Sequence, residues 1–153
     1  MNKENAEVGS LKNILLVEDD PRDVELTLAA LEEHRLANKV VVVRDGEQAL
    51  DYLYHRGEFK KRAGGNPILV LLDLKMPKVN GLEVLTIIKD DEQLKTIPVV
   101  VLSSSRETPD VAGCYQHGVN AYVVKPVDFA EFMKAVKQLG IFWAAVNEPP
   151  PTP

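Results

Sequence analysis

The sequence predicts an α/β fold, in which a doubly wound parallel sheet carries helices on both faces. Five short runs rich in Val, Ile and Leu occur along the 153 residues, and segments with helical spacing of apolar residues alternate with them. The runs show no regular polar alternation, which is typical of strands that are covered on both faces. Because short connections and right-handed crossovers join such strands, the alternation favours a parallel, doubly wound arrangement.

The predicted strands are short and end at polar or turn residues. They are Asn13–Val17, Lys39–Val43, Ile68–Leu72, Pro98–Leu102 and Ala121–Val124. In an open parallel sheet, ligands bind outside the carboxyl ends of the strands. The residues that directly follow each run are therefore the first candidates for a functional site.

Each predicted helix opens with residues that favour a helix N-terminus. Polar caps, an N1 proline and a Glu three positions after a cap mark these openings. They lie at Asp20-Pro21, Asp45, Asn80 with Glu83, Thr108-Pro109-Asp110 and Asp128 with Glu131. The second helix is expected to run through Leu53, and the fourth to close near Gly118.

The composition indicates one globular domain without a membrane segment. The chain is 45% hydrophobic and 27% charged, and no apolar run approaches the roughly 20 residues that span a bilayer. Its net charge of −5 argues against nucleic acid as the main partner. The polar segment Met1–Ser10 does not resemble a secretory signal, so a cytoplasmic protein is the simplest interpretation. The single Cys114 cannot form an internal disulfide and is interpreted as a buried helical cysteine.

The predicted domain boundaries leave short tails at both ends. Residues 1–10 are expected to be flexible, residues 11–146 to form the domain, and the Pro-rich residues 147–153 to be extended or disordered. A basic cluster lies between His55 and Arg62. It is interpreted as a solvated loop, and docking of a partner protein on it is the alternative.

Acidic, hydroxyl and basic residues follow four of the predicted strands. They are Glu18-Asp19-Asp20 after the first, Asp73 after the third, Ser103 after the fourth and Lys125 after the fifth. Most of them have a simpler explanation when taken alone. Asp20 is expected to be a helix cap, Ser103 can begin a turn, and Lys125 can be a surface lysine.

Asp73 is harder to explain in this way, because it directly follows five apolar residues of a predicted interior strand. A buried charge must be paired or bound. Glu18, Asp19 and Asp73 together carry a formal charge of −3, and Mg²⁺ with Lys125 supplies +3. The charges of the site therefore cancel when a metal is present. Carboxylates, a hydroxyl, a lysine and Mg²⁺ suit phosphoryl transfer, and an attacking Asp yields an aspartyl phosphate.

Four segments of the chain resemble the receiver domain of two-component response regulators. They span nearly the whole chain in that family's order and spacing, and they are Ile14–Pro21, Leu71–Pro77 with Asn80-Gly81, Val99–Ser103 and Ala121–Pro126. The resemblance implies a flavodoxin-like (βα)5 fold with strand order 2-1-3-4-5. It also implies a signalling protein, not an enzyme, that accepts a phosphoryl group from a partner histidine kinase.

The resemblance implies a role for each residue at the strand ends. Asp73 is the phosphoacceptor, and Ser103 and Lys125 contact the phosphoryl group. Mg²⁺ is held directly by Asp19, Asp73 and the backbone carbonyl of Lys75. Glu18 contacts it through a water. All of these residue types stand at the matching positions of this chain.

The resemblance also implies a conformational switch. Tyr122 matches the aromatic residue that turns inward when Ser103 moves toward the phosphoryl group. The face made by the helix that opens at Thr108, the strand Ala121–Val124 and the last helix then changes shape. No DNA-binding or enzymatic output domain follows the last helix, so output is expected through a partner.

Two features give a finer resemblance and a candidate interface. The basic extension between Tyr54 and Asn66 and the Phe142-Trp143 ending are similar to the small regulators of phytochrome histidine kinases. On the last helix, Phe132, Val136 and Leu139 are expected to pack on the sheet. Phe142 and Trp143 lie beyond them, and a homodimer that covers these two side chains is a hypothesis.

Three other functions stay open at this point. A Mg²⁺-dependent phosphatase of the haloacid dehalogenase type also forms an aspartyl phosphate, but it needs an Asp where this chain has Lys75. A degenerate receiver binds partners without phosphorylation, although it usually lacks a key group that this chain keeps. A phosphorelay intermediate differs only in the next acceptor. In each receiver case the donor histidine is expected on another protein, because the chain's own histidines lie in no kinase context.

Overall fold

The computed structural model describes residues 13–33, 36, 39–76, 78–126 and 128–151. Within them, one five-stranded parallel sheet has the order β2-β1-β3-β4-β5. The strands are β1 (Ile14–Val17), β2 (Val40–Val43), β3 (Leu69–Leu72), β4 (Val99–Ser103) and β5 (Ala121–Val124). The predicted strand order is confirmed, and the predicted strand bounds differ by at most one residue. The segment 1–10 that was expected to be flexible lies outside the described residues, as do the last two residues of the expected tail.

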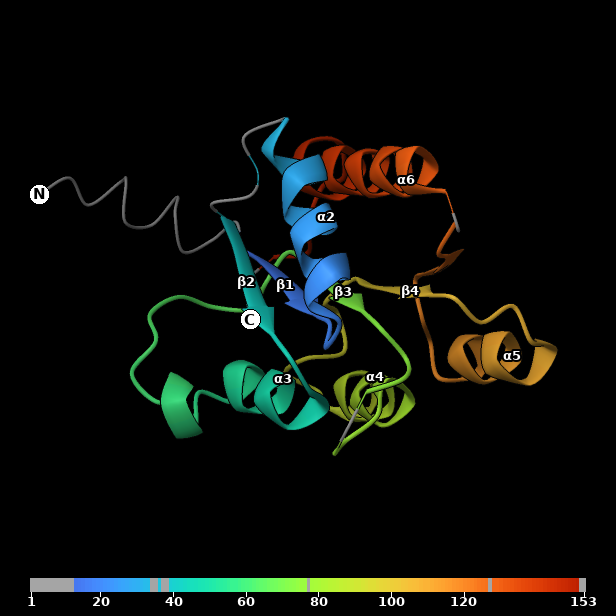
Figure 1. Ribbon diagram of the computed structural model, residues 1–153. Coiled ribbons are helices and arrows are strands. Elements are labelled where there is room, and N and C mark those ends of the chain that lie inside the picture. Colours follow the sequence, from blue (N-terminus) through green and yellow to red (C-terminus); the bar gives the residue numbers. More distant parts are fainter. Residues whose placement is uncertain (1–12, 34–35, 37–38, 77, 127, 152–153) are drawn as a thin grey trace, which may run out of the picture.

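Helices cover both faces of the sheet, which confirms the doubly wound arrangement (Figure 1). On one face lie α2 (Pro21–Glu32) and α6 (Phe129–Ile141), which also pack against each other. On the other face lie α3 (Gly46–Leu53), α4 (Gly81–Asp90) and α5 (Thr108–Gln116). Among the described residues, no helix is long and apolar enough to cross a membrane.

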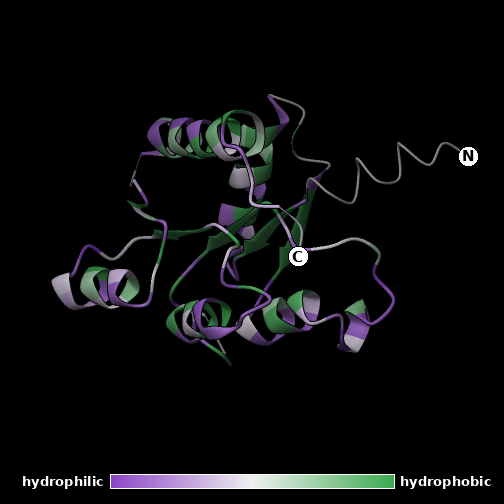
Figure 2. Cartoon of the chain, turned by 180° about the vertical axis from the view of Figure 1, so that it is seen from behind, coloured by the Kyte–Doolittle hydropathy of each residue, from purple (hydrophilic) through white to green (hydrophobic). Residues whose placement is uncertain are grey.

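The central strands are buried on both sides, as their apolar runs predict. Along β1 and β3 the side chains alternate between two separate cores. Toward α3, α4 and α5 point Leu15, Val17, Val70 and Leu72, and toward α2 and α6 point Ile14, Leu16, Leu69 and Leu71. Figure 2 shows the apolar strands between helices whose outer faces are more polar.

The helix openings follow the predicted capping chemistry. Four side chains accept a hydrogen bond from a backbone amide of the first turn, and they are Asp20, Asp45, Asn80 and Asp128. The fourth predicted opening is different, because α5 starts at Thr108 after Glu107, whose side chain makes no cap bond. Cys114 is fully buried on α5, as expected.

The basic extension after α3 is more ordered than a solvated loop. It contains a short 3₁₀ helix, η2 (Gly57–Phe59), and the Phe59 ring meets the Tyr52 ring edge-on at 5.1 Å. The Arg62 guanidinium lies 4.0 Å from the centre of the Tyr52 ring and donates to the Tyr52 carbonyl at 2.6 Å. The loop prediction therefore holds for the exposed His55, Arg56, Lys60 and Lys61, and it is wrong for Arg62.

The end of α4 is fixed to the start of β4 by one lysine. The Lys89 ammonium donates to the carbonyl of Lys95 at 3.1 Å, to the carbonyl of Ile97 at 2.8 Å and to Asn120 Oδ1 at 3.0 Å. The same Asn120 oxygen accepts from the Val99 amide at 2.8 Å. Burial lowers the pKa of Lys89, because it takes the charged ammonium partly out of water.

Replacing Lys89 by Met should destabilise the fold by about 1–3 kcal/mol, because the part-buried Ile97 carbonyl loses its donor. Replacing Lys95 by Met is the matched control, since the Lys95 side chain forms an exposed ion pair with Glu92. We expect this control to change the free energy of unfolding by less than about 1 kcal/mol. Urea unfolding followed by circular dichroism measures both, and equal effects would mean that the Lys89 bonds contribute little.

Candidate functional site

The register of the sheet brings strand-end residues together. Val17 pairs with Leu72 across β1 and β3, so Glu18 and Asp73 leave the sheet side by side. Glu18, Asp19 and Asp73 each offer a carboxylate oxygen, and these oxygens all lie within 4.8 Å of one another. The three carboxylates singled out in the sequence therefore form one cluster at the carboxyl edge.

Burial and crowding disfavour the charged forms of two of these carboxylates. Burial raises the pKa of Glu18 to about 7, and the nearby Asp73 adds to this effect while Lys125 opposes it. Burial also raises the pKa of Asp73, although Lys125, Glu18 and the Lys75 backbone amide act in the other direction. A cation among the carboxylates would relieve this repulsion. The all-oxygen donor set fits a hard divalent ion.

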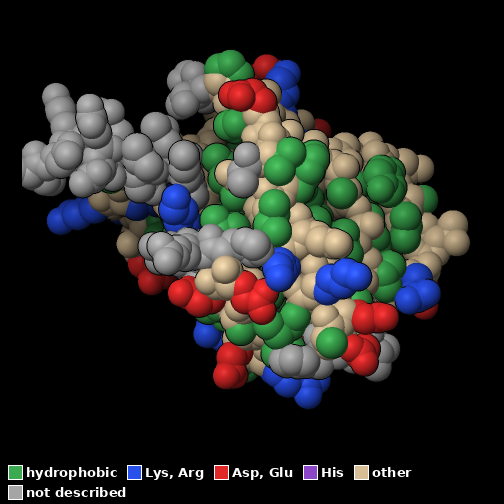
Figure 3. Space-filling model, turned by 90° about the horizontal axis from the view of Figure 1, so that it is seen from above, with side chains coloured by type: hydrophobic (Ala, Val, Ile, Leu, Met, Phe, Trp, Pro, Cys, Tyr) green, Lys and Arg blue, Asp and Glu red, His purple; other side chains and the backbone are tan. Residues whose placement is uncertain are grey.

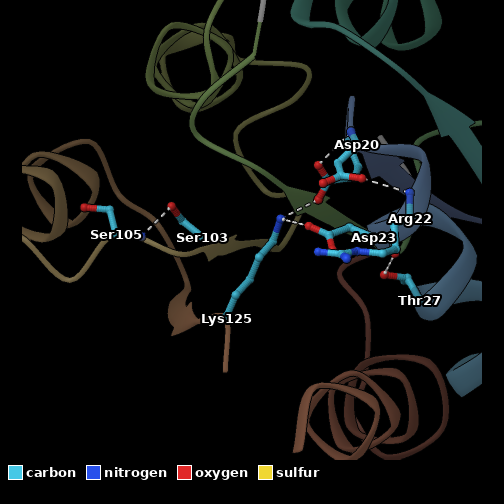
Figure 4. Close-up of polar contacts among 8 residues, drawn as sticks. Asp20, Arg22, Asp23, Thr27, Ser103, Ser105 and Lys125 are labelled. Atoms are coloured by element: carbon cyan, nitrogen blue, oxygen red, sulfur yellow. Dashed lines mark hydrogen bonds and ion pairs between the residues drawn. The ribbon is translucent and has the colours of Figure 1, made fainter. Parts of the chain in front are cut away.

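Lys125, which follows β5, reaches across the sheet edge to two carboxylates. Its ammonium lies 2.7 Å from Glu18 Oε1 and 2.7 Å from Asp23 Oδ2 (Figure 4). Burial acts to lower the pKa of Lys125, but the bonds to Asp23 and Glu18 outweigh it, so the net pKa is raised. The lysine is therefore held as a cation at the edge of the acidic cluster.

Asp23 also belongs to this site, although its place in the sequence does not single it out. Asp23 lies in the first turn of α2, where acidic residues are common because they favour the helix dipole. Its spacing of three residues from the Asp20 cap is the only local signal, and it is also the spacing of an ordinary helix start. Asp20 itself is exposed and accepts from the Arg22 amide at 2.8 Å, which confirms it as a cap.

The loop after β4 connects the site to α5 and β5. Ser103 is buried, and its hydroxyl accepts from the Ser105 amide at 3.2 Å. The Ser105 hydroxyl donates to Asp110 of α5 at 2.5 Å, and the Tyr122 hydroxyl donates to the Ser105 carbonyl at 2.7 Å. The Tyr122 ring also packs against the core on the side of α3, α4 and α5. Ser103 and Tyr122 therefore belong to one hydrogen-bonded unit with Ser105.

A cleft opens beside the acidic cluster, between the starts of α4 and α5. Its volume is about 460 Å³. Polar residues line it together with apolar ones, and the lining consists of Asp19, Leu74, Lys75, Met76, Asn80, Leu82, Pro109, Asp110 and Cys114. Asp19 is the member of the acidic cluster that lines this cleft.

The family model of the response regulator receiver domain matches residues 14–137. The chain belongs to this family. Receiver domains interact with histidine kinases, and phosphorylation on an aspartate is a property of the family, so this chain is a receiver-domain signalling protein.

Two relatives match the receiver chain over most of its length. A probable methanogenesis regulatory protein, FilR2 of Methanothrix harundinacea, is 41% identical over 140 residues, which are 90% of this chain and 86% of that protein. Response regulator Rcp1 of a Synechocystis strain is 39% identical over 132 residues, which are 86% of this chain and 88% of that protein. Both relatives are similar to the chain far beyond the site itself.

Solved structures similar to this receiver include regulators of phytochromes. The phosphorylated cyanobacterial phytochrome response regulator RcpA matches with a TM-score of 0.85 at 40% identity, over 92% of this chain and 99% of that one. The bacteriophytochrome response regulator RtBRR matches with a TM-score of 0.73 at 63% identity, over 92% of this chain and 85% of that one. The relatives of this receiver thus include phytochrome-associated regulators.

A divalent metal is present in one of the similar structures. The Mn²⁺-bound form of Rcp1 matches with a TM-score of 0.85 at 37% identity, over 92% of this chain and 99% of that one. Receiver domains bind a divalent metal, and this chain carries an acidic cluster suited to one. Oxygen donors from three carboxylates are the chemistry that such an ion requires.

Proposed function

We propose that Asp73 is the phosphoacceptor of this receiver and that a histidine kinase is the donor. The observation that carries the proposal is the convergence of Asp73 with Glu18 and Asp19 at the end of a buried central strand. In the transfer, an Asp73 carboxylate oxygen attacks phosphorus, the bond from phosphorus to the kinase histidine nitrogen breaks, and the neutral histidine leaves. The product is an aspartyl phosphate.

Mg²⁺ is the metal that we propose for this cluster. The carboxylates of Glu18, Asp19 and Asp73 and the backbone carbonyl of Lys75 would hold it. When bound, the ion neutralises negative charge on the transferred group. Support comes from the raised pKa values of Glu18 and Asp73, which are caused chiefly by burial, because a bound cation would stabilise the charged forms that burial disfavours.

We propose that Ser103 and Lys125 contact the phosphoryl group and that the Tyr122 side chain turns inward when Ser103 moves toward this group. The supporting contacts are the Ser103–Ser105 and Tyr122–Ser105 bonds, through which a movement of Ser103 displaces the start of α5 and β5 together. The face formed by α5, β5 and α6 then changes shape and is read by a partner. In this proposal the protein acts only on its own phosphorylation and is not an enzyme for other substrates.

The donor that we propose is a phytochrome-type histidine kinase. The support is the 63% identity to RtBRR and the likeness to RcpA, both described as phytochrome regulators. Such a kinase requires ATP, which places the exchange in the cytoplasm. The folded unit is proposed to end near Val146, where the helical segment η3 (Phe142–Val146) that continues α6 also ends.

The test is transfer from a purified, radiolabelled phytochrome kinase, combined with calorimetric titration of beryllofluoride in Mg²⁺. Beryllofluoride imitates the phosphoryl group on an aspartate. The proposed function predicts label on the regulator and analogue binding that requires Mg²⁺. A protein that folds but takes neither label nor analogue would instead be a receiver that binds partners without phosphorylation.

A homodimer through the end of α6 is the second part of the proposal. Phe142 is 47% exposed and Val146 is 66% exposed, and they stand four residues apart on η3. Phe142 also meets the Trp143 ring edge-on at 5.1 Å. Figure 3 shows apolar side chains gathered on the side of the molecule that carries α6. A second copy of the chain would cover this surface.

Replacing Phe142 by Glu should convert a dimer into a monomer, because the charge would be buried at the interface. Sedimentation equilibrium with and without beryllofluoride measures the mass. The matched control replaces Tyr115, an aromatic residue of α5 that is 53% exposed, by Glu, and it should leave the dimer intact. A wild-type protein that stays monomeric at high concentration in both states would contradict the dimer.

A further inference from the structure

Asp23 holds the site lysine but has no role among those proposed above. Its carboxylate shares the Lys125 ammonium with Glu18, at 2.7 Å in each case. Asp23 is fixed by the first turn of α2, and its backbone carbonyl accepts from the buried Thr27 hydroxyl at 2.7 Å (Figure 4). Its side chain is only 20% exposed. The ion pair is therefore a built contact between α2 and the end of β5.

We infer that Asp23 is a positioning residue that restrains the Lys125 ammonium and so opposes its recruitment by a phosphoryl group on Asp73. This inference rests on the proposed function, in which Lys125 contacts that group. In this role, Asp23 makes formation of the phosphorylated state less favourable.

Charge gives the sign of the effect. Asp23 adds a fourth carboxylate to the surroundings of Glu18, Asp19 and Asp73, and the Lys125 ammonium forms ion pairs with Glu18 and Asp23. A phosphoryl group adds about −1.5 to −2 units of charge to the site. Each further carboxylate therefore disfavours the phosphoryl group and favours a metal cation.

Geometry indicates that the Asp23 bond opposes a shift of the Lys125 ammonium away from α2. The ammonium has three donors, of which Glu18 and Asp23 take two. Asp23 is carried by a helix, so it cannot follow the lysine, whereas the long lysine side chain can reorient. A phosphoryl oxygen on Asp73 that draws the ammonium toward itself therefore works against the Asp23 bond.

A structural role for the ion pair would have a different signature. If Asp23 only fixed α2 against β5, its loss would loosen the whole edge of the sheet. The binding of Mg²⁺ and the binding of beryllofluoride would then both become weaker. The restraint predicts opposite changes, because removal of one negative charge weakens metal binding while it strengthens binding of the anionic phosphoryl group. The two titrations together thus separate the two roles.

The experiment compares wild type with Asp23→Asn, which keeps the side-chain size and an acceptor oxygen. Calorimetry measures the affinity for Mg²⁺ alone and for beryllofluoride in saturating Mg²⁺. We expect Mg²⁺ affinity to fall roughly threefold and beryllofluoride affinity to rise roughly three- to tenfold. Glu25→Gln is the matched control, because it removes an exposed carboxylate from the same helix, and it should change neither affinity by more than about twofold.

The outcomes separate the inference from the proposed function. If wild type fails to bind beryllofluoride, the proposed function fails and the inference falls with it. If wild type binds and Asp23→Asn binds equally or more weakly, the inference alone is overturned. Asp23→Ser, which also removes the charge, must shift both affinities in the same directions, so a folding defect of one variant does not decide the result.

Discussion

Asp73→Asn is expected to abolish phosphorylation while leaving the fold intact. The amide has no carboxylate oxygen to attack phosphorus, so the rate of transfer should fall by more than about a thousandfold. The side chain keeps its size, and the change removes a carboxyl group whose pKa is raised chiefly by burial. Without metal, the variant should therefore be at least as stable as wild type. Intact mass after incubation with the labelled kinase measures transfer, and urea unfolding measures stability.

Asp20→Asn is the matched control for this experiment. Asp20 stands in the same acidic run, but it is exposed and caps α2, a task that Asn performs equally well. We expect this variant to accept the phosphoryl group at a rate close to that of wild type. Label that persists in Asp73→Asn, or disappears in Asp20→Asn, would move the acceptor away from Asp73.

Gly81→Ala should damage both the fold and the site, because the start of α4 lies against the backbone of Asp73. A Cβ at Gly81 would lie 2.2 Å from the Asp73 carbonyl oxygen and 2.6 Å from the Leu74 Cα. The Gly81 amide also donates to the Leu74 carbonyl at 2.8 Å. These are backbone atoms that cannot rotate away, so the loop that presents Asp73 must move.

We expect Gly81→Ala to lower the free energy of unfolding by about 2–4 kcal/mol and to weaken Mg²⁺ binding at least tenfold. Gly113→Ala is the control, since a Cβ there meets only a Leu82 methyl carbon at 3.9 Å. Because Gly113 lies inside α5, this control should be neutral or stabilising by up to about 1 kcal/mol. Urea unfolding and a Mg²⁺ titration test both variants. Normal binding by Gly81→Ala would show that the Asp73 loop adapts to the added methyl.

Several parts of the molecule could be predicted because their signals are local. An apolar run as short as Leu69–Leu72 is enough to indicate a buried strand, and a cap such as Asp45 needs only the three residues that follow it. Asp73 could be singled out since a carboxylate directly after a buried strand must be compensated. The resemblance to receivers depends on segments that are likewise short and continuous.

Other parts were decided by contacts between distant elements. Asp23 and Lys125 are 102 residues apart, and each is an ordinary charged residue until the fold brings the start of α2 to the residue that follows β5. The same holds for Arg62, which looks like one more cation of a loop until its guanidinium lies over the Tyr52 ring.

The sequence by itself determined the order of strands and helices along the chain, the caps of the helices and the acidic residues at the strand ends. Hydrophobic periodicity and hydrogen bonding within one helical turn are sufficient for these features. Only the tertiary structure decided which carboxylates share the Lys125 ammonium and why Gly81 carries no side chain. Such contacts depend on the distances between whole elements, which no pattern within a single element records.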